Sequence, residues 1–124
     1  MRITRDRFER LVREEFRVVL EALAPELRVM AEKVTIVTAD RPSEYERDRT
    51  GAEDLLGLYE GVSLTERRFD DMETVADVIT LFRVPLMEIC RTEKKIREEV
   101  RLTIIHELGH YFGFEEGELE ARGL

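Results

Sequence analysis

The residues able to do chemistry gather near the end of the 124-residue chain, where His106, Glu107 and His110 form an HExxH pattern. Residues four positions apart lie on one face of a helix, so both imidazoles can reach one metal ion. Neutral imidazole nitrogen is a preferred ligand of zinc. Glu107 adjoins the first histidine and can take a proton from a water molecule on the metal, whose pKa falls toward about 7. The spacing therefore predicts a hydrolytic zinc site, with His106 and His110 as ligands and Glu107 as the catalytic base.

A glycine and two carboxylates follow the second histidine. Gly113 comes three residues after His110, at a place where a helix can end with a positive φ at little steric cost. Glu115 and Glu116 come directly afterwards. A carboxylate from this turn would complete a three-ligand zinc site that keeps its fourth position for water.

The residues from His106 to Glu116 resemble the extended zincin signature HExxHxxGxxD/H. The short acidic chain, with HELGHYFG near its end, resembles the small bacterial mini-zincins, which are metallopeptidases related to aspzincins. The resemblance implies one zinc ion per chain, held by His106, His110 and Glu116, and a peptide or protein substrate. The chain departs from the aspzincin pattern at position 116, where it has Glu in place of Asp. The sequence leaves the third ligand open between Glu116 and Glu115. We expect Glu116 to bind and Glu115 to face solvent, and a more distant Asp or Glu is the other competing ligand.

Composition narrows the class of protein. The length predicts a single domain over residues 1–124. The net charge of −8 argues against nucleic acid or an anionic membrane as a partner. No run of about 18 apolar residues exists, and the charged first residues do not resemble a signal peptide. Cys90 is the one cysteine, which excludes an intrachain disulfide and favours the cytoplasm. The oligomeric state is not readable from these features.

The content of charged and amide residues bears on whether the protein comes from a thermophile. Asn and Gln are absent, and 39% of the residues are charged. Loss of thermolabile amides together with dense ion pairing is typical of thermophiles. A GC-rich genome would give the same bias toward arginine.

Two long helices are expected to position the site. Apolar residues recur with helical periodicity over 4–23, with Thr4 as the N-cap and Pro25 beyond the end. Thr92 is the expected N-cap of a second helix that runs to about residue 112 and carries the motif. A short helix or turn is expected over 86–90, and a final helical turn over 115–121.

Three extended segments are expected between these helices. They cover residues 33–39, 55–64 and 77–84; Gly57 and Gly61 indicate bends or bulges, and Pro85 ends the last segment. Polar loops are expected over 40–54 and 67–74. The order of elements predicts an α+β fold. The resemblance implies a minimal zincin-like fold, in which the N-terminal helix and a small twisted sheet pack with the C-terminal HExxH helix. In zincins an edge strand pairs with the substrate backbone. The resemblance makes residues 80–83 or 55–59 the candidates for such an edge strand here.

The function predicted from these residues is a zinc-dependent hydrolase, with a metallopeptidase as the leading interpretation. The alternative is a non-catalytic zinc-binding structural or regulatory module with a degenerate protease fold. The intact Glu107 favours the enzyme, because a purely structural site has no use for that carboxylate. Zincins often add a side chain that stabilises the oxyanion, and the sequence leaves this choice open among Tyr59, Tyr111, Tyr45 and Arg83.

Overall fold

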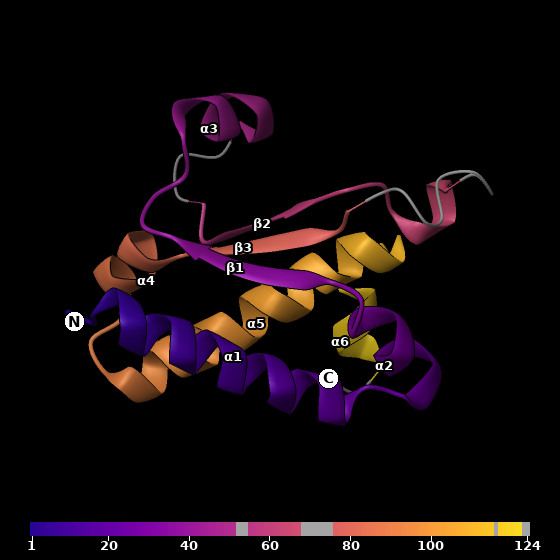
Figure 1. The fold of residues 1–124 in the computed structure, drawn as a ribbon, viewed down its shortest axis with the longest axis horizontal. Helices are drawn as coiled ribbons and strands as arrows, with labels where there is room; N and C mark the ends of the chain where they lie inside the picture. Colours follow the sequence, from indigo (N-terminus) through magenta and orange to yellow (C-terminus); the bar gives the residue numbers. More distant parts are fainter. Residues whose placement is uncertain (52–54, 68–75, 116, 123–124) are drawn as a thin grey trace.

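Three strands form a small mixed sheet in the order β1-β3-β2 (Figure 1). In this computed structural model, which describes residues 1–51, 55–67, 76–115 and 117–122, they are β1 (Thr35–Ala39), β2 (Gly57–Glu60) and β3 (Val78–Phe82). β1 pairs with β3 in parallel, and β2 pairs with β3 in antiparallel register. β3 is therefore the central strand, and β2 forms one edge of the sheet.

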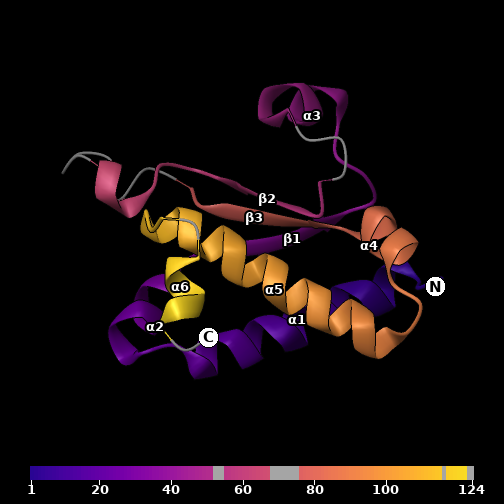
Figure 2. The same ribbon diagram turned by 180° about the vertical axis from the view of Figure 1, so that it is seen from behind.

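The two predicted long helices cover one face of this sheet (Figures 1 and 2). α1 (Arg5–Ala22) packs against α5 (Glu93–Phe112) and β1, while α5 also packs against β2 and β3. Thr4 and Thr92 cap these helices as predicted, because each side chain accepts a hydrogen bond from a backbone N–H in the first turn. The predicted α+β arrangement of an N-terminal helix, a small sheet and a C-terminal HExxH helix is confirmed.

An ionic network and an apolar core join α1 to α5. Glu15 is 4% exposed on α1 and accepts hydrogen bonds from Arg97 (3.1 Å) and Arg101 (2.9 Å) of α5. Below it lie fully buried side chains from both helices and from the central strand, among them Phe8, Leu11, Val12, Ile79, Leu81, Ile96, Ile104 and Leu108. The motif helix is thus held firmly along its length.

Two parts of the predicted secondary structure are wrong. The polar loop expected over 40–54 contains the helix α3 (Glu44–Thr50), which Ser43 and Glu46 begin with a capping box. α3 lies on the side of the sheet opposite α1 and α5 (Figure 1). The last strand ends at Phe82, because α4 (Arg83–Ile89) starts there with Pro85 in its first turn, where no N–H partner is required.

Shorter elements complete the described chain. They are α2 (Pro25–Ala31), which was not predicted, η1 (Leu64–Glu66) and α6 (Glu118–Ala121), which lies in the predicted final turn. Most of the loop predicted over 67–74 lies outside the described residues. Among the described helices, none has the length and apolar character needed to cross a membrane.

Candidate active site

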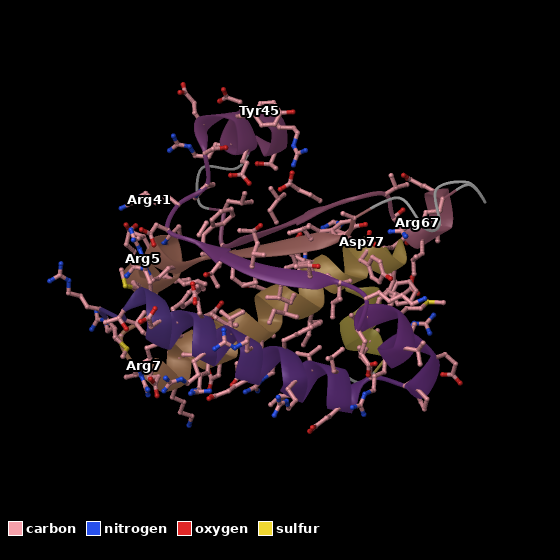
Figure 3. The ribbon with its side chains drawn as sticks, in the orientation of Figure 1. Arg5, Arg7, Arg41, Tyr45, Arg67 and Asp77 are labelled. Carbon is pink, nitrogen blue, oxygen red and sulfur yellow. The ribbon has the colours of Figure 1, made fainter. Side chains whose placement is uncertain are left out.

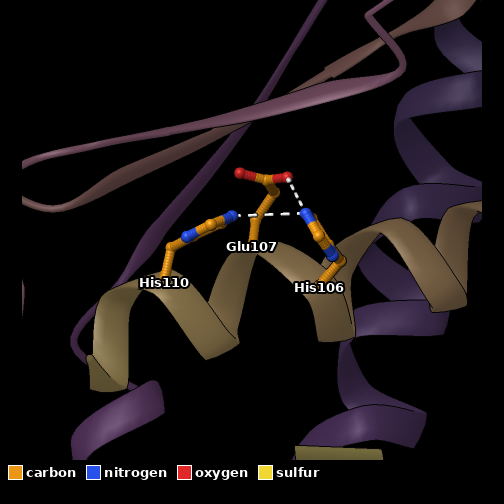
Figure 4. A group of neighbouring side chains, drawn as sticks. All are labelled: His106, Glu107 and His110. Carbon is orange, nitrogen blue, oxygen red and sulfur yellow. Dashed lines mark hydrogen bonds and ion pairs between the residues drawn. The ribbon is translucent and has the colours of Figure 1, made fainter. Parts of the chain in front are cut away.

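The three motif side chains leave α5 on the face that looks toward the sheet (Figure 4). The Nε2 atoms of His106 and His110 lie 3.2 Å apart, and the Glu107 Oε2 atom lies 3.8 Å from His106 Nε2. One donor atom from each residue falls within 4.8 Å of the others. Glu107 is 8% exposed, whereas His110 is exposed at the surface. The sequence prediction that the two histidines share one helix face is confirmed.

The spacing of the two histidines fits a zinc ion. Two nitrogens bound at about 2.05 Å to a tetrahedral centre lie roughly 3.3 Å apart. The observed separation of 3.2 Å is close to this value. The two imidazoles therefore form a possible metal site without rearrangement of the helix that carries them.

The Glu107 carboxylate is held from above by the edge strand. The backbone N–H of Tyr59 in β2 donates a hydrogen bond of 2.9 Å to Glu107 Oε1. Phe82 N–H donates to the Leu56 carbonyl, so the alternate residues Gly57 and Tyr59 direct their backbone groups away from β3, toward the free edge. Anchoring one carboxylate oxygen leaves the other oxygen beside the histidines.

A glycine allows β2 to come this close to α5. A Cβ atom built on Gly57 would lie 2.5 Å from the Thr103 methyl carbon and 3.1 Å from the Thr80 carbonyl oxygen. Ordinary carbon contacts begin at about 3.5 Å. From the sequence, Gly57 is expected to mark a bend or bulge, whereas in the structure it permits a close approach between strand and helix. That close approach is what brings the Tyr59 amide within hydrogen-bonding distance of Glu107.

A second glycine ends the motif helix as predicted. Gly113 has φ 78° and its N–H closes the last turn of α5. A Cβ atom there would overlap with Thr65 of η1, so the same glycine lets η1 pack on the end of α5. The segment 61–66 thereby becomes a wall next to the motif.

A cleft opens between this wall, β2 and the end of α5. Its volume is about 490 Å³, enough for more than one amino-acid side chain. We call it the active-site cleft; it is lined by Leu58, Tyr59, Gly61, Ser63, Thr65, Glu66, Glu107, His110, Gly113 and Phe114. Glu107, the predicted general base, and His110 therefore lie in the wall of this cleft.

A buried ion pair fixes the wall and the edge strand to each other. Arg67 and Asp77 pair with side chains only 5% and 6% exposed, and they lie together at one end of the sheet (Figure 3). The Tyr59 hydroxyl donates to Asp77 (2.8 Å), and Arg67 donates to the Val62 carbonyl (2.8 Å). Burial, followed by the hydrogen bond to Asp77, raises the pKa of Tyr59 well above its ordinary value. Tyr59 is therefore a neutral hydrogen-bond donor over the whole working range of pH.

The structure separates the four candidate oxyanion residues. Tyr59 lines the active-site cleft, with its hydroxyl engaged by Asp77. Tyr111 is 1% exposed and donates to the Met30 carbonyl (3.0 Å). Tyr45 is 70% exposed on α3, and Arg83 bonds Asp40 and the Ile3 carbonyl. The last three are not brought to the motif.

The predicted third ligand, Glu116, lies outside the described residues. Glu115 is exposed, as predicted. It also lines a small pocket shared with His106, Gly109 and His110. Glu115 therefore stays the competing carboxylate for this position.

Two edge-strand candidates were named from the sequence, and the sheet order decides between them. Residues 55–59 include most of β2, which is the edge strand above α5. Residues 80–83 include most of the central strand β3, which has neighbours on both sides. The backbone available to an extended ligand near the motif is therefore that of β2.

An HExxH helix beneath the edge strand of a small mixed sheet is the arrangement of a zincin-type metal site. The chain belongs to the family of zincin-like metallopeptidases, whose family model matches residues 31–124. No curated protein sequence matches the chain. The matched residues include the sheet, the active-site cleft and the whole of α5.

Proposed function

We propose that this protein is a zinc-dependent peptidase in which Glu107 is the general base. The observation that carries the proposal is the placement of the Glu107 carboxylate, with one oxygen on the Tyr59 amide and the other beside the paired histidines. A metal site that only stabilised the fold would not need a carboxylate held in this way. Membership of the zincin-like metallopeptidase family supports a peptide bond as the target.

The chain's own residues would divide the work as follows. His106 and His110 hold the ion through Nε2, and a carboxylate from the turn after Gly113, Glu116 in our proposal, completes the set. When bound, zinc supplies a Lewis acid that polarises a carbonyl and acidifies water. Glu107 Oε2 takes the proton of the attacking water, and the same carboxyl group then delivers that proton to the leaving amine.

The edge strand supports binding of an extended peptide. The Gly57 backbone and the Tyr59 carbonyl face the free edge of β2, directly above the motif, whereas the Tyr59 N–H bonds Glu107. A peptide that pairs with this edge would pass over Glu107 and His110 in the active-site cleft. A peptide or protein substrate and a cytoplasmic location stay predictions from sequence and resemblance.

Metal content and turnover test the proposal together. The parent protein, purified without chelator, should contain about one zinc ion per chain and cleave members of a broad peptide library. Glu107→Gln should keep the zinc and lose cleavage, because Glu107 activates water and is not a ligand. Loss of zinc from this variant would reject its assigned role, and full activity would reject the mechanism. Stoichiometric zinc in a parent protein that cleaves nothing would favour the non-catalytic module.

The third ligand needs its own pair of variants. Glu116→Ala should weaken zinc affinity strongly, whereas Glu115→Ala should leave it nearly unchanged. The two residues are adjacent and carry the same charge, so each variant is the matched control for the other. Equal zinc affinity in Glu116→Ala and the parent protein would exclude Glu116 as a ligand.

A further inference from the structure

The wall that the segment 61–66 gives to the active-site cleft carries an acidic side chain. Glu66, at the end of η1, is exposed and lines the cleft together with the hydroxyl-bearing Ser63 and Thr65. Among the described residues of the lining, it is the one charged side chain apart from Glu107 and His110 of the motif. Within the described part of the chain, no cationic side chain forms an ion pair with Glu66.

Two arginines of the described residues that adjoin the cleft already have partners. Arg67 is buried in its pair with Asp77. Arg122 lies over the ring of Phe114, 4.6 Å from the centroid, and bonds Glu118 at 3.0 Å. Neither guanidinium is in the lining of the cleft. The Glu66 carboxylate is therefore available to a ligand that binds in the active-site cleft.

The C-terminal end of α5 adds to the negative electrostatic potential in the cleft. The helix ends at Gly113, which lies in the cleft lining beside His110. The carbonyl end of a helix carries a partial negative charge of about half an electron, which favours cations near the last turn. Both the helix end and Glu66 thus favour positive charge in this part of the cleft.

We infer that the part of the cleft beside Glu66 is a subsite for a lysine or arginine side chain of the substrate. This inference rests on the proposed peptidase function and specifies its substrate class. Leu58 and Phe114 give the cleft apolar surface, against which the methylene stem of a basic side chain can lie. The hydroxyls of Ser63 and Thr65 can accept hydrogen bonds from the cationic end. An acidic side chain in the same place would meet Glu66 and the helix end and be repelled.

A binding experiment tests the subsite without requiring turnover. The probes are fluorescent peptides of one sequence that differ at a single scanned position, which carries Arg, Gln or Glu. They are titrated onto zinc-loaded Glu107→Gln protein, in which the charge of the general base is absent. At one scanned position the Arg peptide should bind about twofold to fivefold more tightly than the Gln peptide, the range of an exposed ion pair. The Glu peptide should bind more weakly than both.

Charge variants of Glu66 then locate the effect. Adding Glu66→Gln should abolish the preference for Arg, and adding Glu66→Arg should reverse it. Glu21→Arg is the matched control, because it makes the same change of charge on an exposed residue of α1 that does not line the cleft. An unchanged preference in Glu66→Arg would overturn the inference, and so would an equal loss of preference in Glu21→Arg.

The outcome separates this inference from the peptidase proposal. Arg-selective binding that depends on Glu66, in a protein that cleaves no peptide, would support the subsite and reject the peptidase. Cleavage of peptides by the parent protein with no dependence on Glu66 would support the peptidase and reject the subsite.

Discussion

Replacement of Gly57 by alanine tests whether the close approach of β2 to α5 positions Glu107. The added Cβ would lie 2.5 Å from the Thr103 methyl carbon, roughly 1 Å inside ordinary contact. If β2 moves away by this amount, the Tyr59 N–H to Glu107 Oε1 distance grows from 2.9 Å to roughly 3.9 Å. At that distance the hydrogen bond is lost.

The expected magnitudes follow from this displacement. Overpacking costs about 1–3 kcal/mol, and replacement of a glycine returns about 0.4–1 kcal/mol through the unfolded state. A net loss of roughly 1–2 kcal/mol lowers Tm by roughly 4–8 °C for a chain of this length. Misplacement of a catalytic group by about 1 Å costs on the order of 100-fold in turnover. The zinc content should not change, because both histidines lie on α5.

Two measurements report on the contact itself. Hydrogen exchange of the Tyr59 amide should be slow in the parent protein and faster in Gly57→Ala, because the amide loses its acceptor. Thr103→Ser removes the methyl group that the new Cβ meets but keeps the hydroxyl that bonds the Glu99 carbonyl. The double variant Gly57→Ala/Thr103→Ser should therefore recover most of the lost stability and amide protection.

Gly109→Ala is the matched control, since an added Cβ there meets nothing within 4 Å. It should raise Tm slightly, because alanine is the better helix former by about 1 kcal/mol. Unchanged exchange of the Tyr59 amide in Gly57→Ala would refute the reasoning. Failure of Thr103→Ser to restore protection would show that the contact with Thr103 is not the cause.

Two further predictions concern ion pairs away from the motif. Glu15→Ala should lower stability by about 1–2 kcal/mol, measured by denaturant unfolding, because it leaves Arg97 and Arg101 without their buried acceptor; an equal loss in Glu14→Ala, at a more exposed partner of Arg97, would contradict this. Hydrogen bonds from Arg5 and Arg83 lower the pKa of Asp40 to about 2, so its stabilisation is present above about pH 4 and is lost as the pH falls toward 2. Asp40→Asn should accordingly reduce the Tm difference between pH 5 and pH 3, and an undiminished difference would assign the acid sensitivity to other carboxylates.

The long elements could be predicted because their signals are local and strong. α1 and α5 each combine a threonine cap with many apolar residues that the core buries. α3 was missed because it buries none of its residues, so hydrophobic periodicity has nothing to detect. Its capping box at Ser43 and Glu46 was the available signal. Pro85 was taken as the end of a strand, although proline is equally compatible with the first turn of a helix.

The candidate site was predictable only in its helical half. The spacing of His106 and His110 is a property of one helix, so it can be read from the sequence. The contact between Tyr59 and Glu107 joins residues 48 positions apart. It uses a backbone N–H, which nearly every residue type has, so the sequence does not mark it. Gly57 was the indirect signal, since a glycine within a strand also marks close approach of another backbone or side chain.

This difference in sequence separation has a consequence for the order of events during folding. The two histidines acquire their relative geometry as soon as α5 forms, on the microsecond timescale of helix formation. The bond from Tyr59 to Glu107 must wait until β2 docks on α5, and contacts between distant parts of a chain form more slowly. In the proposed peptidase, the two histidines would therefore be in place for a metal before the Glu107 carboxylate is aligned. Hydrolysis by that site would begin only after β2 has docked on α5.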